Sequence, residues 1–151
     1  AAHIAGHRPI RVTASQVSNS EGTDENIVAT IDLMDGSSAT ILYTALGDPA
    51  YGKERFEIFC DGKVASIDDF QRLTTVENGQ SKSHRRGRHD KGHRQELRRF
   101  VHATQNDEDL TEEFWCSVES TLATLRAVDS LRESRAFEIE DMRSNRSDRT
   151  R

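Results

Sequence analysis

Hydrophobic and polar residues alternate near the beginning of the chain, where Ile10, Val12 and Ala14 are each followed by a polar residue. A period of two is typical of a strand that buries one face. The pattern therefore predicts a strand here. A loop is expected next, over residues 18–25, because these are almost all polar or glycine.

Two apolar runs, residues 27–33 and 37–45, flank Asp35-Gly36 and predict a β-hairpin. A two-residue loop would mix polar and apolar residues on both faces. A three-residue loop, residues 34–36, gives one clean apolar face and places Gly36 in the left-handed conformation. We expect the second register, because a slip by one residue would move the whole apolar set off the core. The expected apolar pairs are Ile27 with Tyr43, Ala29 with Ile41, and Ile31 with Ala39.

A second hairpin is predicted around Asp61-Gly62, with strands over residues 55–60 and 63–68. A two-residue loop pairs Phe56 with Ile67 and Ile58 with Ala65, and it places Arg55 opposite Asp68 on the other face. A further strand over residues 70–76, a turn at 77–79 and an edge strand over 80–86 are expected to follow.

A helical period is found only in the last third of the chain. Leu97, Phe100, Val101 and Thr104 have the spacing of one helix face, and Asp90 is the expected N-cap. A second helix is expected from an N-cap at Thr111 to about residue 133. Its expected apolar stripe is Phe114, Trp115, Val118, Leu122, Leu125 and Val128.

Strands followed by helices indicate an α+β fold, with an open, mainly antiparallel sheet of about six strands and helices on one face. We expect a single domain over residues 1–133 and a polar, largely disordered tail over residues 134–151. The other sheet face, with Val28 and Leu42, is expected to be wet or covered by a partner.

Composition indicates a soluble protein, since 34% of the 151 residues are hydrophobic and 31% are charged. No apolar run is long enough to span a membrane, and no signal peptide is recognisable. Two cysteines, Cys60 and Cys116, are too few for a disulfide framework. We expect both thiols to be reduced and buried, and the protein to be cytoplasmic.

The net charge of −5 conceals a basic stretch, residues 84–99, with seven Lys or Arg against two acids, followed by an acidic stretch over residues 105–119. The sequence pI of about 5.7 and the lack of aromatic residues in the basic stretch argue against nucleic-acid binding. A match between the two stretches, within or between subunits, is the favoured interpretation. His89 and His93 have helical spacing but lie among cations, so a metal site is not expected.

No complete catalytic or cofactor-binding motif is found, because no two glycines are spaced as in a dinucleotide-binding loop and no phosphate loop or nucleophile elbow is present. We expect no cofactor to bind this chain by itself. The polar residues near strand ends and helix starts that could line a substrate pocket are Tyr43, Lys53, Arg55 and His93.

Three ordered stretches carry a family resemblance: residues 35–48 (DGSSATILYTALGD), 53–70 (KERFEIFCDGKVASIDDF) and 90–103 (DKGHRQELRRFVHA). Together they resemble the C-terminal domain of the glucose–fructose oxidoreductase, inositol dehydrogenase and MocA (Gfo/Idh/MocA) family. The resemblance covers about residues 4 to 132.

The resemblance implies a fold like the C-terminal domain of glyceraldehyde-3-phosphate dehydrogenase. It also implies an NAD(P)-dependent oxidoreductase acting on sugars or polyols, with this domain shaping the pocket for the small-molecule substrate and forming a homo-oligomer through its open sheet face. The Rossmann domain and the catalytic Lys and His of the family are absent from this sequence, so we expect a fragment that is inactive alone. His3 and His7 do not inherit the catalytic role. On resemblance, Tyr43, Lys53, Arg55 and His93 are the pocket candidates.

Two other functions remain open from the sequence. One is a free-standing module that uses an open sheet face to dimerise or to hold a partner. The other is a nucleic-acid or phosphate binder that uses the basic stretch.

Overall fold

The computed structural model describes residues 2–16, 26–85, 87 and 90–143. They form two compact units, one comprising residues 1–46 and 109–151 and the other residues 47–108. This division differs from the expected single domain over residues 1–133. The predicted polar loop at residues 18–25 lies outside the described residues.

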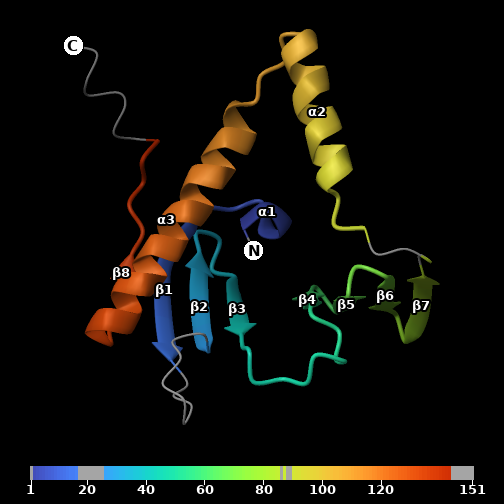
Figure 1. Cartoon of the computed structure of the whole chain (residues 1–151), viewed down its shortest axis with the longest axis horizontal. Coiled ribbons are helices and arrows are strands. Elements are labelled where there is room, and N and C mark those ends of the chain that lie inside the picture. The colour runs from blue at the N-terminus through green and yellow to red at the C-terminus, as the bar shows by residue number, and fades with distance from the viewer. Residues whose placement is uncertain (1, 17–25, 86, 88–89, 144–151) are drawn as a thin grey trace. The chain divides into compact units, whose positions relative to one another are not determined.

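The first unit contains one four-stranded sheet, in the order β3-β2-β1-β8 (Figure 1). A short helix, α1 (Ala2–Ala5), precedes β1 (Pro9–Gln16), and β2 (Ile27–Leu33) and β3 (Ser38–Tyr43) follow. The long helix α3 (Thr111–Glu133) leads into β8 (Phe137–Glu138).

The hairpin of β2 and β3 has the register expected from the sequence. Ile27 pairs with Tyr43 and Ile31 with Ala39. Gly36 has a φ of 87° and donates its N–H to the carbonyl of Leu33. The left-handed conformation that only glycine adopts without strain therefore sets the three-residue loop.

The core of the first unit lies where α3 packs on β1. Val12, Ala123 and Ile139 are buried together, and Ile31 packs against them from β2. Val12 lies opposite Ile31 in the sheet, so the apolar face predicted from the alternation is the face that α3 covers.

The buried face of α3 differs from the predicted stripe. Its buried residues are Glu119, Ala123 and Ser130, whereas Phe114 and Leu125 are more than half exposed. Small residues on this face allow the helix axis to approach β1 closely, and large ones would hold it away. The helix ends at Glu133 as expected, but its N-cap is Leu110 rather than Thr111.

The segment after α3 is not a polar tail over residues 134–143. Ser134 takes a left-handed conformation, and Phe137 then pairs with Val12 as part of β8. Ile139 is 4% exposed, and its N–H donates to the carbonyl of Ile10. Two apolar residues among many charges are enough to attach the segment, because the edge of β1 offers unpaired backbone groups.

The second unit contains the other four-stranded sheet, in the order β4-β5-β6-β7. Its strands are β4 (Arg55–Cys60), β5 (Lys63–Asp68), β6 (Arg72–Glu77) and β7 (Gln80–Arg85), and the helix α2 (His93–Gln105) follows. The α+β class and the antiparallel strands agree with the sequence, but there are two sheets of four strands in place of one of about six.

The second hairpin also has the expected register, with Phe56 opposite Ile67 and Arg55 opposite Asp68. Asp61 and Gly62 both have positive φ, as a two-residue turn of type I′ requires. Asp69 and Phe70 have positive φ too, which delays the start of β6 to Arg72. Unlike the expected pair of buried thiols, Cys60 is exposed and Cys116 half-buried, and both are free.

Candidate functional site

The four residues predicted to line a pocket lie in both units. Tyr43 ends β3 in the first unit, and Lys53, Arg55 and His93 belong to the second. All four side chains are exposed. No hydrogen bond or ion pair in the described part of the chain joins any two of them, so the site remains a prediction.

Arg55 begins β4 and is held by its neighbours along the chain. Its Nη1 donates to the hydroxyl of Tyr51 at 3.2 Å, and its Nε lies 3.8 Å from a carboxylate oxygen of Glu57. The hydrogen bond with Tyr51 and the nearby carboxylates raise the pKa of Arg55 above its ordinary value. Arg55 is thus a charged donor that Tyr51 orients at the end of the sheet.

The start of α2 is attached to the start of β4 by a lysine. The Nζ of Lys91 donates to Glu54 at 3.0 Å and lies 5.7 Å from the ring centroid of Phe70. Phe70 in turn contacts Phe56 edge to face, with ring centroids 5.5 Å apart. Two of the stretches that carry the family resemblance, 53–70 and 90–103, thus meet at Lys91.

His93 is the first residue of α2, next to an uncapped helix start. The N-cap is Gly92, with a φ of 84° and no side-chain cap, rather than the expected Asp90. Asp90 accepts a hydrogen bond from the N–H of Gly92 at 2.9 Å instead. A left-handed residue is needed to turn the chain into the helix, and glycine meets that need.

Tyr43 lies beside a small buried polar network. The Oδ1 of Asn26, a residue 1% exposed, accepts from the hydroxyl of Thr44 at 2.8 Å and from the N–H of Ala45 at 3.1 Å. A backbone N–H can only donate, so the amide orientation of Asn26 is determined. The network holds the strand end from which Tyr43 projects.

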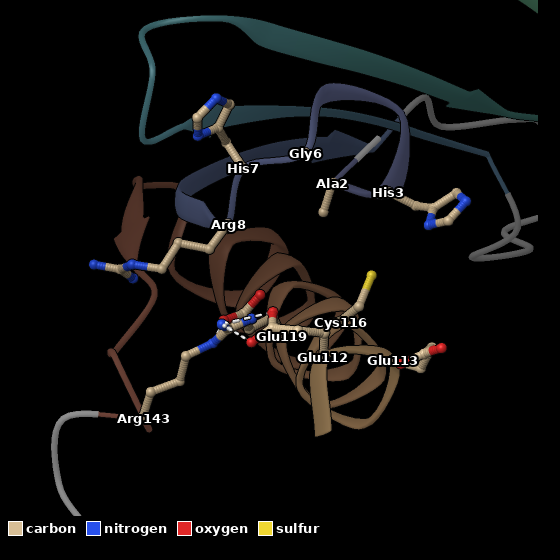
Figure 2. Close-up of a pocket in the computed structure, with 10 residues that line it drawn as sticks. All are labelled: Ala2, His3, Gly6, His7, Arg8, Glu112, Glu113, Cys116, Glu119 and Arg143. Carbon is tan, nitrogen blue, oxygen red and sulfur yellow. Dashed lines mark hydrogen bonds and ion pairs between the residues drawn. The ribbon is translucent and has the colours of Figure 1, made fainter. Parts of the chain in front are cut away.

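A hollow of about 390 Å³ lies in the first unit (Figure 2). Residues before β1 and on α3 line it, together with Arg143: Ala2, His3, Gly6, His7, Arg8, Glu112, Glu113, Cys116 and Glu119. The sequence did not single out this place for binding.

Arg143 forms ion pairs with two carboxylates in this hollow. Its Nε donates to Glu119 at 2.8 Å and its Nη1 to Glu112 at 3.0 Å, as the dashed lines in Figure 2 indicate. The side chain of Glu119 is only 7% exposed, and its hydrogen bond raises the pKa of Arg143. Arg143 thus pairs with two of the carboxylates that line the hollow.

Sequence reasoning missed Glu119 and Arg143. The available signal was the position of Glu119, four residues before Ala123 on the helix face that packs inward. A carboxylate on such a face requires a cation, because an unpaired buried charge is very costly. The partner of Glu119 is Arg143, which lies in the tail that was expected to be disordered.

The basic and acidic stretches do meet within the chain. Arg99 forms an ion pair with Glu108, and Nδ1 of His102 lies 3.0 Å from the same carboxylate. Of the residues described, no three His, Cys, Asp or Glu side chains are grouped so that they could hold a metal ion. None of the described helices is long and apolar enough to cross a bilayer.

Comparison with solved structures defines the fold. Over 91% of its length the chain matches aldose-aldose oxidoreductase from Caulobacter crescentus, with a TM-score of 0.71 and 11% identity. It also matches the UDP-N-acetylglucosamine 3-dehydrogenase GnnA from Acidithiobacillus ferrooxidans over 68% of its length, with a TM-score of 0.55 and 20% identity. The chain spans 43% and 33% of these two proteins, less than half of each.

By name, the two structural neighbours are an aldose-aldose oxidoreductase and a dehydrogenase of UDP-N-acetylglucosamine. The expected fold, an antiparallel α+β domain of the kind found in such enzymes, is thereby confirmed. No protein-family model matches the sequence. No curated protein matches it either.

Proposed function

We propose that the chain is the substrate-binding and oligomerisation domain of an NAD(P)-dependent oxidoreductase that acts on a sugar or polyol derivative. The observation that carries the proposal is the match to aldose-aldose oxidoreductase over 91% of this chain. A fold alone does not define a function. The three ordered stretches of sequence, two of which meet at Lys91, give independent support.

In this proposal the chain binds and orients the sugar, and a separate dinucleotide-binding domain holds the cofactor. All six strand pairings in the described part of the chain are antiparallel, whereas dinucleotides bind at parallel βαβ units with a glycine-rich turn. NAD(P) would supply hydride transfer when bound to that other domain. In this proposal the part of the present chain is therefore confined to the substrate.

Lys53, Arg55, His93 and Tyr43 are the proposed substrate contacts. Arginine, lysine, histidine and tyrosine side chains hydrogen-bond to sugar hydroxyls, and Arg55 is already oriented by Tyr51. Chemical-shift mapping with glucose, myo-inositol and UDP-N-acetylglucosamine tests this assignment. We expect shifts at Arg55 and His93 with at least one of the three, and weaker binding by Arg55→Gln.

Arg132→Gln is the matched control, since Arg132 is an exposed arginine on α3. It is expected to bind as the wild type does. Shifts confined to residues remote from all four side chains would contradict the proposed contacts.

The oligomerisation part of the proposal rests on one face of the second sheet. Phe59, Val64 and Val76 lie in one row across β4, β5 and β6, and Phe59 is 72% exposed. Exposed apolar rows of this kind are typical of protein interfaces. We propose that a second copy of the chain covers this row.

Sedimentation of Phe59→Ser against Phe114→Ser, an exposed phenylalanine on α3, tests the interface. Only the first substitution is expected to weaken self-association. A dimer that binds none of the three sugars would instead favour the alternative, a free-standing dimerisation module. A monomeric wild type would contradict both the proposed interface and the alternative of a dimerisation module.

A further inference from the structure

Three arginines line one end of the second sheet, on the same face. Arg55 pairs with Asp68, Asp68 with Arg72, and Arg72 with Arg85, so the four residues form one continuous row across β4 to β7. We call this set the arginine row. Directly opposite residues lie on one face with Cβ atoms about 4.5–5.5 Å apart, which brings the guanidinium groups within reach of a single small ligand.

The charge of the row is not balanced. Arg55 has Glu57 at 3.8 Å and Asp68 opposite. Asp68 also lies opposite Arg72, but it forms no ion pair with it. Arg72 and Arg85 lie directly opposite each other, and neither has an ion pair with any residue that the structure describes. Like charges in directly opposed positions destabilise a sheet. An anion bound between the two guanidinium groups would offset this repulsion.

The neighbouring row of the same face supplies hydroxyl groups. This row begins with Glu57, the partner of Arg55, and continues with Ser66, Thr74 and Ser83 across β5, β6 and β7, two residues along each strand from the arginine row. Guanidinium groups bind oxyanions bidentately, and hydroxyls add further donors. Arg72 and Arg85 are exposed, and they lie four residues along each strand from the row with Phe59, at the opposite end of the same face.

We propose that the arginine row binds the phosphoryl group of a small molecule. A phosphate monoester carries about two negative charges at neutral pH, and the diphosphate of a nucleotide diphosphate-sugar carries one on each phosphoryl group, so either ligand matches the two guanidinium groups of Arg72 and Arg85. A carboxylate carries a single charge and would neutralise only one guanidinium group. The inference rests on the proposed function only in taking the ligand to be a phosphorylated sugar, such as a sugar phosphate or a nucleotide diphosphate-sugar.

Calorimetric titration of the 151-residue chain with inorganic pyrophosphate at low salt tests the row itself. The wild type is expected to bind, and Arg72→Gln/Arg85→Gln to bind at least about tenfold more weakly. The control is Arg94→Gln/Arg98→Gln, which removes the same charge from exposed positions of α2 and should retain binding. Equal loss in both double variants would overturn the proposal, because it would reflect overall charge alone.

A melting curve keeps the result interpretable if a variant folds poorly. Without pyrophosphate, Arg72→Gln/Arg85→Gln should melt at the wild-type temperature or above it, because the repulsion is relieved. Pyrophosphate should raise the melting temperature of the wild type and not that of this variant. A variant that melts lower without ligand would contradict the repulsion on which the proposal depends.

Titrations with four further ligands show which kind of molecule supplies the phosphoryl group. The ligands are glucose 6-phosphate, UDP-N-acetylglucosamine, unphosphorylated glucose and a short DNA duplex. Binding of either phosphorylated sugar, lost in Arg72→Gln/Arg85→Gln, supports the inference. Tightest binding to DNA would overturn the small-molecule assignment. Binding of pyrophosphate with no sugar of any kind would support the arginine row and contradict the proposed function.

Discussion

The hydroxyl of Ser130 connects three parts of the first unit. It accepts a hydrogen bond from the N–H of Ala14 at 2.8 Å and donates to the carbonyl of Arg135 at 2.6 Å. The N–H of Ala14 lies beyond the two-residue strand β8, so no strand partner reaches it. A single side chain therefore satisfies a backbone donor that the sheet leaves open.

Ser130→Ala is expected to destabilise the chain by about 1–3 kcal/mol, because it leaves the buried N–H of Ala14 without an acceptor. Urea denaturation measures the change. Ser120→Ala removes an exposed serine from the same helix and should change the unfolding free energy by less than about 0.5 kcal/mol. Equal effects of the two substitutions would show that the buried hydroxyl contributes nothing specific.

A second residue-scale prediction concerns acid stability. Hydrogen bonds from Arg126 lower the pKa of Glu140 below its ordinary value of 4.5. A carboxyl group whose pKa is lower in the folded state stabilises the fold while it is ionised. Its contribution is complete above about pH 4.5 and is lost as the pH falls through the folded-state pKa.

Glu140→Gln should therefore flatten the fall in unfolding free energy below pH 4.5. Arg126→Gln should flatten it similarly, because it removes the same hydrogen bonds. Denaturant titrations from pH 7 to pH 2 measure both profiles. Wild-type slopes in both variants would contradict the assignment.

Among the individual residues, glycine and apolar patterns could be predicted well and buried charges could not. Gly36 and Gly62 determine their turns because they have the conformations that side chains disfavour. Glu119 could not be predicted, because the sequence does not show that Arg143, 24 residues later, will neutralise it. Long-range pairing of this kind depends on tertiary structure.

At the scale of elements, the C-terminal segment has the largest consequence for the first unit. β8 pairs with β1, and Ile139 completes the cluster with Val12 and Ala123. Arg143 then reaches back to α3. The segment closes the side of the core that β1 leaves exposed.

Ile139→Ala should cost about 2–4 kcal/mol, because it opens a cavity in this cluster. Leu125→Ala, at a position 56% exposed on α3, should cost less than about 0.5 kcal/mol. Thermal or urea unfolding measures both. A small effect of Ile139→Ala would indicate that residues 134–143 do not pack on the core in solution.

The same segment shows where pattern analysis of elements fails. Both hairpins were predicted in register, since loop length and alternation together allow only one pairing. β8 has two residues and no period, so no pattern could predict it. The predicted apolar stripe of α3 was right only in part: Leu122 packs against the core, whereas Phe114 and Leu125 are more than half exposed.

At the scale of the whole molecule, the two units differ in how much apolar surface they bury. In the first unit the core includes Val12, Leu33, Ala123 and Ile139. In the second, Ala103 is the one buried hydrophobic residue among those described. Sequence composition could not predict this division, because both sheets have similar alternation.

The rates of amide hydrogen exchange should reflect the difference in buried apolar surface between the two units. We expect the amides of β1, β2 and α3 to exchange more slowly than those of β4 to β7, because local opening requires less apolar exposure in the second unit. Exchange followed by mass spectrometry resolves the two groups of strands. The measurement is made on Phe59→Ser, in which the proposed contact between copies is weakened. Equal protection of both units in this variant would contradict the prediction.

The proposed function assigns the substrate to this chain and the cofactor to another domain. Saturation-transfer NMR of the chain in a single mixture of NADH and UDP-N-acetylglucosamine tests this division most directly. We predict saturation of the sugar nucleotide resonances and none of the NADH nicotinamide resonances. Saturation of the nicotinamide with no transfer to the sugar nucleotide would contradict the account.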